Sequence, residues 1–369
     1  MLKAIVTGGG TGGHIYPALA VAEAFKKLEP EAQIHFIGSS QGMEARIVPE
    51  AGLHFSGVTA RKLYKAVSPG TLMAIFSLMK GYREASAYIR TFRPDVVVGT
   101  GGYVAAATVM AGARQGIPTV IVEENAAPGR TNLWLTRWAE RICIAYPECA
   151  GEFPFAKTVM TGVPIRDHLV SSLSQNASRR ALQLREDCFT LLVAGGSQGA
   201  QHLNTIVREA ARRIEGPIQI LHQVGPKNME NNIPFEDETR LYRPVPYLNS
   251  EEMPAAYRAA DIILCRCGAS TLAEITACGL PALMTPLPTA YADHQTANAR
   301  SVERAGAGVL LPQTELTTIK LIEIVERLRR EPETRRMLAE ASKEFGRPNA
   351  ARDIAQLALD IRYRNRDRG

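Results

Sequence analysis

The amino-acid sequence predicts an α/β protein built from two Rossmann-like domains that face each other. Apolar runs alternate with helical patterns along most of the chain, and one strand–glycine-loop–helix unit occurs twice. The first unit has a strand at 4–7 and glycines within 8–13, and the second has a strand at 191–194 and glycines within 195–199. The 369 residues, 46% of them hydrophobic, suffice for two domains of ordinary size.

The first series of elements fills roughly the first 160 residues. Apolar, β-branched runs bounded by glycine or proline predict parallel strands that are buried on both faces. Apolar residues at helical spacing predict the first helix at 17–28. The predicted strands are 3–7, 33–37, 95–99, 119–123, 141–145 and 158–161.

The second series begins near residue 189, after a polar stretch at 171–187. The predicted domains are therefore 1–161 and 162–345, and a C-terminal segment, 346–369, is expected to pack back on the first domain as a helix. The same criteria predict strands at 189–194, 218–223, 261–265 and 281–285, and helices at 200–214, 270–278, 294–305, 316–330 and 350–363.

Composition excludes several classes of protein. The longest apolar run, 103–113, is shorter than the roughly 20 residues of a membrane-spanning helix. The N-terminus lacks the basic and then apolar pattern of a secretory signal, so a cytoplasmic protein is expected. The six cysteines form no C-x-x-C pair and are expected to be reduced thiols, without a metal.

Residues 61–93 concentrate positive charge, with seven basic residues against a single acidic one, Glu84. Apolar residues lie between the basic ones, a mixture that indicates contact with an anionic membrane surface or an anionic partner. The alternative is an ordinary amphipathic helix whose apolar stripe lies in the core. The residues concerned are Arg61, Lys62, Leu63, Tyr64, Lys65, Leu72, Met73, Ile75, Phe76, Leu78, Met79, Lys80, Tyr82, Arg83, Arg90 and Arg93.

Both glycine-rich loops are candidates for binding an anion, because their backbone amides and the following helix N-terminus attract negative charge. Each of them is as readily explained as a tight structural turn. The loop at 8–13 fits G-x-G-x-x-G, but no acidic residue closes the second strand before Glu44, and neither loop is followed by Gly-Lys-Ser/Thr. Nicotinamide dinucleotide binding and P-loop hydrolysis are therefore disfavoured.

His14 directly follows the first glycine loop and opens a helix. The helix dipole is expected to lower its pKa and keep the imidazole neutral, as a general base requires. The alternative is a packing or capping histidine. Glu123 and Glu124 end a predicted strand, where ligands bind in α/β folds, and could serve as acid, base or sugar-hydroxyl acceptor. Their alternative role is to cap the helix that follows.

The densest group of candidate residues is C-R-C-G-A-S-T-L-A-E at 265–274. A strand ends there, small residues turn, and a helix begins near Ser270. Glu274 could accept hydrogen bonds from both hydroxyls of a ribose while amides of the turn meet phosphates. Alternatively, Thr271 and Glu274 form a capping box. Further on, 293–295 open another helix beside a proline-rich loop, which suits recognition of a sugar.

In their order along the chain, these motifs resemble the peptidoglycan glycosyltransferase family that adds N-acetylglucosamine to lipid-linked N-acetylmuramyl-pentapeptide. The resemblance covers nearly the whole chain and implies the GT-B fold, two Rossmann-like domains facing across a cleft. The motifs are G-G-G-T-G-G-H at 8–14, G-G-Y at 101–103, E-E-N-A-A-P-G at 123–129 with Asn132, G-V-P-I-R at 162–166, G-G-S-Q-G-A at 195–200 with Asn204, C-R-C-G-A-S-T-L-A-E at 265–274 and D-H-Q-T-A-N-A at 293–299.

The resemblance implies inverting transfer from UDP-N-acetylglucosamine to the 4-hydroxyl of undecaprenyl-pyrophosphoryl-N-acetylmuramyl-pentapeptide. It implies no cofactor, no obligatory metal, no nucleic acid, and a peripheral position on the cytoplasmic face of the cell membrane through 61–93. The N-terminal domain would take the acceptor and the C-terminal domain the UDP-sugar. The general base would be His14, with Glu123 as the alternative.

The resemblance also assigns binding residues. Tyr103 and Asn132 match motifs of the acceptor domain. The donor set is Thr11, Gly12, Gly13 and Asn125 near the donor sugar, Arg166 and Ser197 at the diphosphate, Leu248 beside the uracil, Ala269, Ser270 and Thr271 in the nucleotide loop, Glu274 at the ribose, and Gln295 at the sugar hydroxyls.

This chain departs from the family pattern at a few positions. It has Val-Glu-Glu-Asn at 122–125, where the family often has His-Glu-Gln-Asn, and Cys267 where serine or alanine is usual. The segment 247–253 is longer than in some members. Two alternative functions remain at this stage: another UDP-sugar enzyme of the same fold, such as a glycolipid glycosyltransferase or an epimerase, and a nucleotide-binding protein without turnover.

Overall fold

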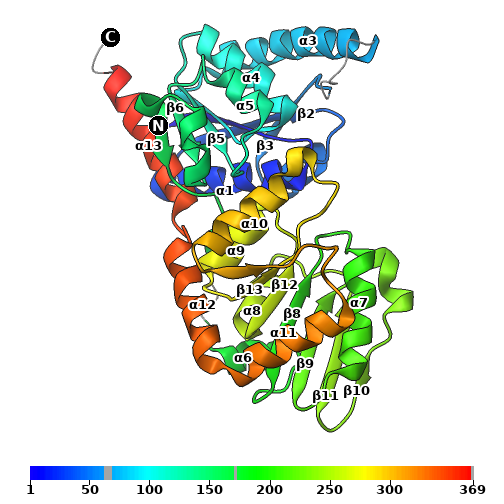
Figure 1. The fold of residues 1–369 in the computed structure, drawn as a ribbon. Helices are drawn as coiled ribbons and strands as arrows, with labels where there is room; N and C mark the ends of the chain where they lie inside the picture. The colour runs from blue at the N-terminus through cyan, green and yellow to red at the C-terminus, as the bar shows by residue number, and fades with distance from the viewer. Residues whose placement is uncertain (62–68, 170–172, 367–369) are drawn as a thin grey trace. The chain divides into compact units, whose positions relative to one another are not determined.

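The computed structural model describes residues 1–61, 69–169 and 173–366. The chain divides into two compact units, Met1–Asp167 with Arg347–Gly369, and His168–Gly346 (Figure 1). Each unit holds one seven-stranded sheet with helices along the chain between its strands. This arrangement confirms the prediction of two Rossmann-like α/β domains.

The first sheet is parallel throughout, with the strand order β3-β2-β1-β4-β5-β6-β7. This order is that of a dinucleotide-binding fold with one further strand at its edge. The strands are β1 (Lys3–Thr7), β2 (Gln33–Ser39), β3 (His54–Val58), β4 (Val96–Gly99), β5 (Thr119–Glu123), β6 (Arg141–Ile144) and β7 (Thr158–Met160).

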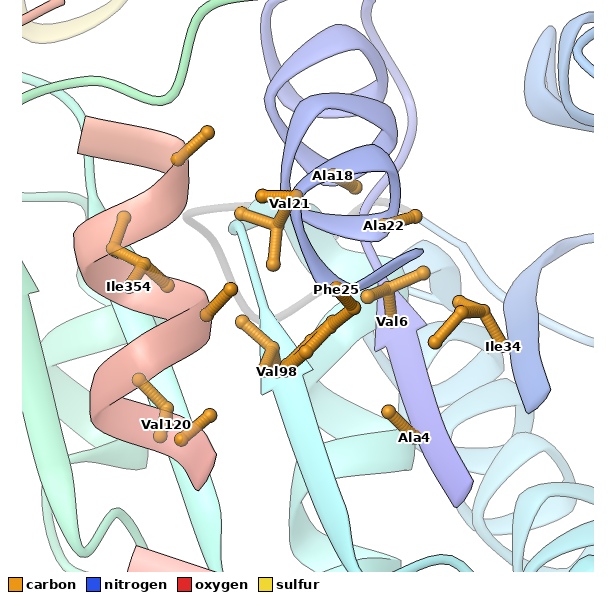
Figure 2. Packing of buried hydrophobic residues seen from close by; sticks show 14 of the residues in the cluster. Ala4, Val6, Ala18, Val21, Ala22, Phe25, Ile34, Val98, Val120 and Ile354 are labelled. Carbon is orange, nitrogen blue, oxygen red and sulfur yellow. The ribbon is translucent and has the colours of Figure 1, made fainter. Parts of the chain in front are cut away.

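Successive side chains of the strands in this sheet pack in opposite directions, as the pleat requires. Ala4 and Val6 of β1 join a cluster with Phe25 and Ile354 (Figure 2), whereas Ile5 packs in a second cluster with residues from α3, α4 and α5. The C-terminal helix therefore shares the first unit's core. The helices of this unit are α1 (Gly12–Leu28), α2 (Glu44–Glu50), α3 (Pro69–Phe92), α4 (Gly102–Arg114), α5 (Arg130–Leu135) and α13 (Ala350–Arg366).

The second sheet has the order β10-β11-β9-β8-β12-β13-β14, in which β11-β9-β8-β12-β13-β14 repeats the six-strand order of the first sheet and β10 is added at the opposite edge. Its strands pair in parallel except for the short edge strand β10. The strands are β8 (Phe189–Ala194), β9 (Ile218–Gln223), β10 (Phe235–Glu236), β11 (Arg240–Val245), β12 (Ile262–Cys265), β13 (Ala282–Met284) and β14 (Gly308–Leu310).

One face of the second sheet is covered by two amphipathic helices, α7 (Gln201–Arg213) and α11 (Thr318–Arg330). Their buried residues, such as Leu203 and Leu321, pack on Leu191 and Val193 of β8. The remaining helices of this unit are α6 (Gln175–Ala181), α8 (Glu252–Ala259), α9 (Ala269–Ala277), α10 (His294–Arg304) and α12 (Pro332–Phe345).

Two features of the structure concern membrane-spanning helices and the state of the cysteines. None of the helices within 1–61, 69–169 and 173–366 is long and apolar enough to cross a membrane. The six cysteines are free thiols in the structure, and five of them are buried.

Each sheet has a topological switch point, between β1 and β4 in the first unit and between β8 and β12 in the second. The strand order reverses there, so the connections leave in opposite directions and open a crevice at the carboxyl ends of the strands. Ligands of doubly wound folds bind in that crevice. The residues that follow these strands are therefore the first places to look for a site.

Candidate active site

The carboxyl ends of β1, β4 and β5 bring three residues together in the first unit: His14, Thr100 and Glu124. The Nδ1 atom of His14 lies 3.1 Å from the carbonyl oxygen of Thr100 and 3.5 Å from Oε2 of Glu124. In return, the Thr100 hydroxyl donates a hydrogen bond of 2.7 Å to the carbonyl oxygen of His14. The histidine is thus fixed by both neighbouring strand ends, while its side chain keeps an exposed fraction of 28%.

The expectation that the helix dipole lowers the pKa of His14 is wrong. Burial does lower this pKa, but the hydrogen bond and charge of Glu124, helped by the charge of Glu123, raise it above its ordinary value. Burial also raises the pKa of Glu124, to about 7. The charge state of the imidazole near neutral pH therefore depends on Glu124 more than on the end of α1.

Glu123 holds a loop in place, and its carboxylate is 2% exposed. Its Oε1 accepts a hydrogen bond of 3.0 Å from the backbone N–H of Asn125. Its Oε2 accepts two bonds of 2.9 Å, from the backbone N–H of Gly129 and from the side-chain amide of Asn132. Gly129 is the N-cap of α5, so Glu123 binds the start of the helix that follows it. This contact resembles the alternative role, capping of that helix, that the sequence left open. A carboxylate so fully engaged is poorly placed to take a proton from a substrate.

The first glycine loop meets a carboxylate of the protein itself. Glu44 is fully buried, and its side chain accepts hydrogen bonds from the backbone N–H of Ser39 (2.9 Å) and of Gly10 (3.4 Å). A Cβ atom on Gly9 would lie 2.2 Å from Glu44 Oε1, so only glycine fits there. These contacts favour a structural turn over a phosphate cradle for this loop. Next to it, Thr11 and Gly13 are exposed, whereas Gly12 and Tyr103 are partly buried.

The second glycine loop is open by contrast. Gly196, Ser197 and Gln198 are exposed, and Gly196 adopts a φ of +96° with no atom near its missing Cβ. Gln223 holds the loop, because its Nε2 donates to the carbonyl oxygen of Gly196 at 3.0 Å. Its Oε1 accepts from the backbone N–H of Leu248 at 2.9 Å. Gln223 therefore ties the loop to the segment around Leu248, whose own amide is no longer free for a ligand.

The turn after β12 shows that the alternative role of Thr271 and Glu274, a capping box, is wrong. Gly268 is the N-cap of α9, and no side chain among the described residues caps it, so the capping box of Thr271 and Glu274 is not formed. Glu274 Oε2 instead accepts a hydrogen bond of 2.8 Å from the hydroxyl of Tyr257, on α8. Ser270 and Thr271 are partly exposed in the first turn of α9. The carboxylate is thus oriented from a neighbouring helix.

Gln295 has a defined amide orientation. Its Oε1 accepts hydrogen bonds from the backbone N–H groups of Cys267 (3.2 Å) and Leu287 (2.9 Å). Since the acyl oxygen faces two donors, the opposite end of the amide is its N–H₂ group, which can donate to a hydroxyl oxygen. The predicted helix does begin here, at His294.

The candidate residues therefore fall into two sets, one in each unit. Arg166 belongs to the first unit, where its guanidinium lies 5.4 Å from the ring centre of Tyr16. The first set is Thr11, Gly12, Gly13, His14, Tyr103, Glu123, Asn125, Asn132 and Arg166, and the second is Ser197, Leu248, Ala269, Ser270, Thr271, Glu274 and Gln295.

Sequence reasoning missed the residues that hold these candidates in place. They are Glu44 and Thr100 in the first unit, and Gln223 and Tyr257 in the second. Thr100 follows a strand between two glycines, and Gln223 ends a strand two residues before Gly225, a signal that could have pointed to them. Glu44 and Tyr257 have no such signal, because each reaches its partner from a different element.

Comparison with known proteins assigns the family. Residues 4–144 match the glycosyltransferase family 28 N-terminal domain, and residues 190–357 match the family's C-terminal domain. A protein of Desulfitobacterium hafniense (strain DSM 10664 / DCB-2) is 39% identical over 98% of this chain and 100% of its own length. It is named UDP-N-acetylglucosamine–N-acetylmuramyl-(pentapeptide) pyrophosphoryl-undecaprenol N-acetylglucosamine transferase, the enzyme called MurG. The chain belongs to the MurG family.

Solved structures agree with this assignment. MurG of Acinetobacter baumannii superposes with a TM-score of 0.77 at 29% identity, covering 98% of this chain and all of the other. UDP-GlcNAc 2-epimerase of Neisseria meningitidis, solved with UDP-GlcNAc, has a TM-score of 0.68 at 16% identity, over 98% and 100% of the two chains, which shows a shared fold alone. As a member of the MurG family, the chain is a glycosyltransferase with the predicted GT-B type of fold.

Proposed function

We propose that this protein transfers N-acetylglucosamine from UDP-N-acetylglucosamine to the 4-hydroxyl of undecaprenyl-pyrophosphoryl-N-acetylmuramyl-pentapeptide, with inversion, in peptidoglycan synthesis. The observation that carries the proposal is the 39% identity, over essentially the whole of both chains, with a protein of that name. The His14–Glu124 pair at the strand ends of the first unit and Glu274 on the helix after β12 support it, because function is argued from such sites and not from the fold alone.

The second unit offers several groups that suit a nucleotide-sugar donor. Amides of the open loop at 195–199 and the N-terminus of α9 offer hydrogen-bond donors and a positive dipole to a diphosphate. Glu274, oriented by Tyr257, is suited to the ribose hydroxyls, and the free N–H₂ end of Gln295 to a sugar hydroxyl. Arg166 and Ser197 are proposed at the diphosphate and Leu248 beside the uracil.

The reaction follows from these roles. Nε2 of His14 takes the proton of the acceptor 4-hydroxyl while that oxygen bonds to the anomeric carbon of the donor sugar. The bond from this carbon to the phosphate oxygen breaks, and its electron pair leaves with UDP. Loop amides and the α9 dipole stabilise the charge that develops on the leaving diphosphate.

The exposed face of α3 supports the proposal that the first unit docks on an anionic membrane, where a lipid-linked acceptor resides. Ala74, Ser77, Gly81, Ala85 and Ile89 form its buried side. On the other side, the exposed fraction is 50% for Met73, 69% for Phe76 and 50% for Met79, and Lys80 and Arg83 follow one turn on. Apolar side chains between cations are typical of interfacial helices. Lys62, Leu63, Tyr64 and Lys65 of the predicted segment lie outside the described residues.

Replacing Phe76 and Met79 together by serine should weaken binding to vesicles of phosphatidylglycerol and phosphatidylcholine by about a hundredfold or more, because each buried apolar side chain contributes about 1.5–3 kcal/mol. The measurement is co-sedimentation at low and high salt. The matched control replaces Ile319 and Met337, exposed at 58% and 62% on the second unit, and should bind like the wild type. Equal binding by both double variants would contradict docking through α3.

The function itself is tested by label transfer. We expect radiolabel from UDP-N-acetylglucosamine to appear in the lipid fraction when the protein is incubated with a short-chain lipid-linked muramyl-pentapeptide, in the presence of EDTA. Transfer in EDTA also tests the family's lack of a metal requirement. Transfer that occurs only after magnesium is added would support the proposed reaction and contradict the expected independence of metal.

The same assay separates the two alternative functions. Isomerised UDP-sugar without lipid label would favour an epimerase, and transfer to other lipid acceptors alone would favour a different glycolipid glycosyltransferase. UDP binding with no product of any kind would favour a binding protein without turnover. Each of these results would overturn the proposal.

A further inference from the structure

The side chain of Glu124 is a buried carboxylate with an incomplete set of partners. Its exposed fraction is 3%, and Oε2 lies 3.5 Å from Nδ1 of His14. Among the described residues, its other oxygen, Oε1, has no hydrogen-bond partner. A buried ionisable group without full hydrogen bonding is costly to the fold, so a role in the site is a physical reason for it to be there.

The position of the ring proton of His14 follows from its neighbours. The carbonyl oxygen of Thr100 can only accept, and it lies 3.1 Å from Nδ1, so Nδ1 carries the hydrogen. In the neutral imidazole, Nε2 then holds the free electron pair. Gly101 and Gly102 leave room for the ring, since a Cβ on Gly101 would lie 3.0 Å from Nδ1 and one on Gly102 3.3 Å from Cδ2. Their φ values of +107° and +79° also favour glycine.

We propose that Glu124 is a positioning residue for the transfer reaction: its carboxylate faces the Nδ1–H of His14 and stabilises the imidazolium that forms when Nε2 takes the acceptor proton. This inference rests on the proposed function, in which His14 is the base. The buried carboxylate supplies the charge opposite to the one that develops on the ring, within about 4 Å and away from bulk water.

The charges around His14 agree with this role. From the end of β5 the ring faces Glu124 and, at longer range, Glu123, and both favour the protonated imidazole. From the end of β4 it faces the Thr100 carbonyl dipole, which acts in the same direction. The N-terminus of α1, the ring's own helix, opposes them with its positive dipole. The net effect is a raised pKa for His14, and Glu124 is the main contributor to that rise.

The test is Glu124→Gln, which keeps the size of the side chain and removes its charge. The expected result is that the acid limb of the pH profile of kcat/KM moves to lower pH, by about one to three units, because the pKa of His14 loses its nearby opposite charge. The titration of the His14 ring followed by NMR should move by the same amount. The control Glu152→Gln removes an exposed carboxylate of the same unit and should move neither.

A purely structural role for Glu124 predicts a different result. It would lower kcat or the thermal stability while leaving both the pH limb and the NMR titration of His14 in place, and this would overturn the inference. The NMR titration needs no turnover. If the titration shifts but the wild-type protein transfers no label, the His14–Glu124 pairing stands and the proposed transferase function is rejected. If the wild-type protein transfers label normally but the titration does not shift, the function stands and the pairing is rejected.

Discussion

Replacing His14 by alanine should lower kcat by about 10²–10⁴-fold and leave the affinity for UDP-N-acetylglucosamine nearly unchanged. The reason is that the substitution removes the group proposed to take the acceptor proton, while the residues proposed at the nucleotide loop, the ribose and the sugar hydroxyls belong to the second unit. The measurements are steady-state transfer rates and calorimetric titration with the donor, both on the purified variant.

The pH profile sharpens this prediction. Because the pKa of His14 is raised, its imidazole becomes protonated, and useless as a base, already above the ordinary histidine pKa as the pH falls. The wild-type rate should therefore decline on the acid side with a midpoint above about 6.5. In the alanine variant, the residual rate should lack this limb. The control His54→Ala removes an exposed histidine of β3 and should retain both rate and profile. Loss of donor affinity equal to the loss of rate would make His14 a binding residue.

Much of the fold could be predicted from local sequence. The strands β1, β5, β8 and β9 have the bounds that the sequence predicts, because their runs are apolar or β-branched and end at residues that break a strand. β11 was missed for the opposite reason. Its sequence, R-L-Y-R-P-V, is polar and contains Pro244, and it becomes a strand through pairing with its neighbours, along its whole length with β9 and over two residues with β10. The sequence of neither segment alone predicts that the two will pair.

The candidate active site, like the fold, could be predicted from local sequence only in part. The sequence placed His14 beside a glycine loop and Glu124 at a strand end, but their contact depends on the strand order β1-β4-β5. Without that order, the helix dipole was the only visible influence on His14. A dipole at a helix end changes the free energy of a charge by about 0.3–1 kcal/mol, whereas an opposite charge a few ångströms away shifts a pKa by one to three units. The nearer charge therefore decides the direction.

Glu44 has a structural role that its position in the sequence did not predict. In the sequence it came too late to be the ribose-binding carboxylate of a dinucleotide fold. The structure places it under the first glycine loop, bonded to the amides of Ser39 and Gly10. The two glycine loops look alike in sequence, yet one is closed by this internal carboxylate and the other is open to solvent.

Replacing Glu123 by alanine should destabilise the first unit by at least about 3 kcal/mol. The substitution removes the acceptor of the partly buried backbone N–H groups of Asn125 and Gly129, and one of the two acceptors of the buried Asn132 amide, and each donor left unsatisfied costs about 1–3 kcal/mol. For a unit of this size, the loss corresponds to a fall in melting temperature of about 6 °C or more. Thermal unfolding followed by circular dichroism measures it, with Glu152→Ala, an exposed carboxylate, as the matched control.

Hydrogen exchange distinguishes this anchoring role from the alternative in which Glu123 is the base. An anchor predicts that the amides of Asn125 and Gly129 exchange faster in the variant, since both donate directly to the carboxylate. Activity alone does not separate the two, because a displaced loop also moves Glu124 away from His14. Loss of turnover in Glu123→Ala with wild-type melting temperature and unchanged exchange over 124–129 would instead show that the carboxylate acts on the substrate, and His14 would lose its assignment as base.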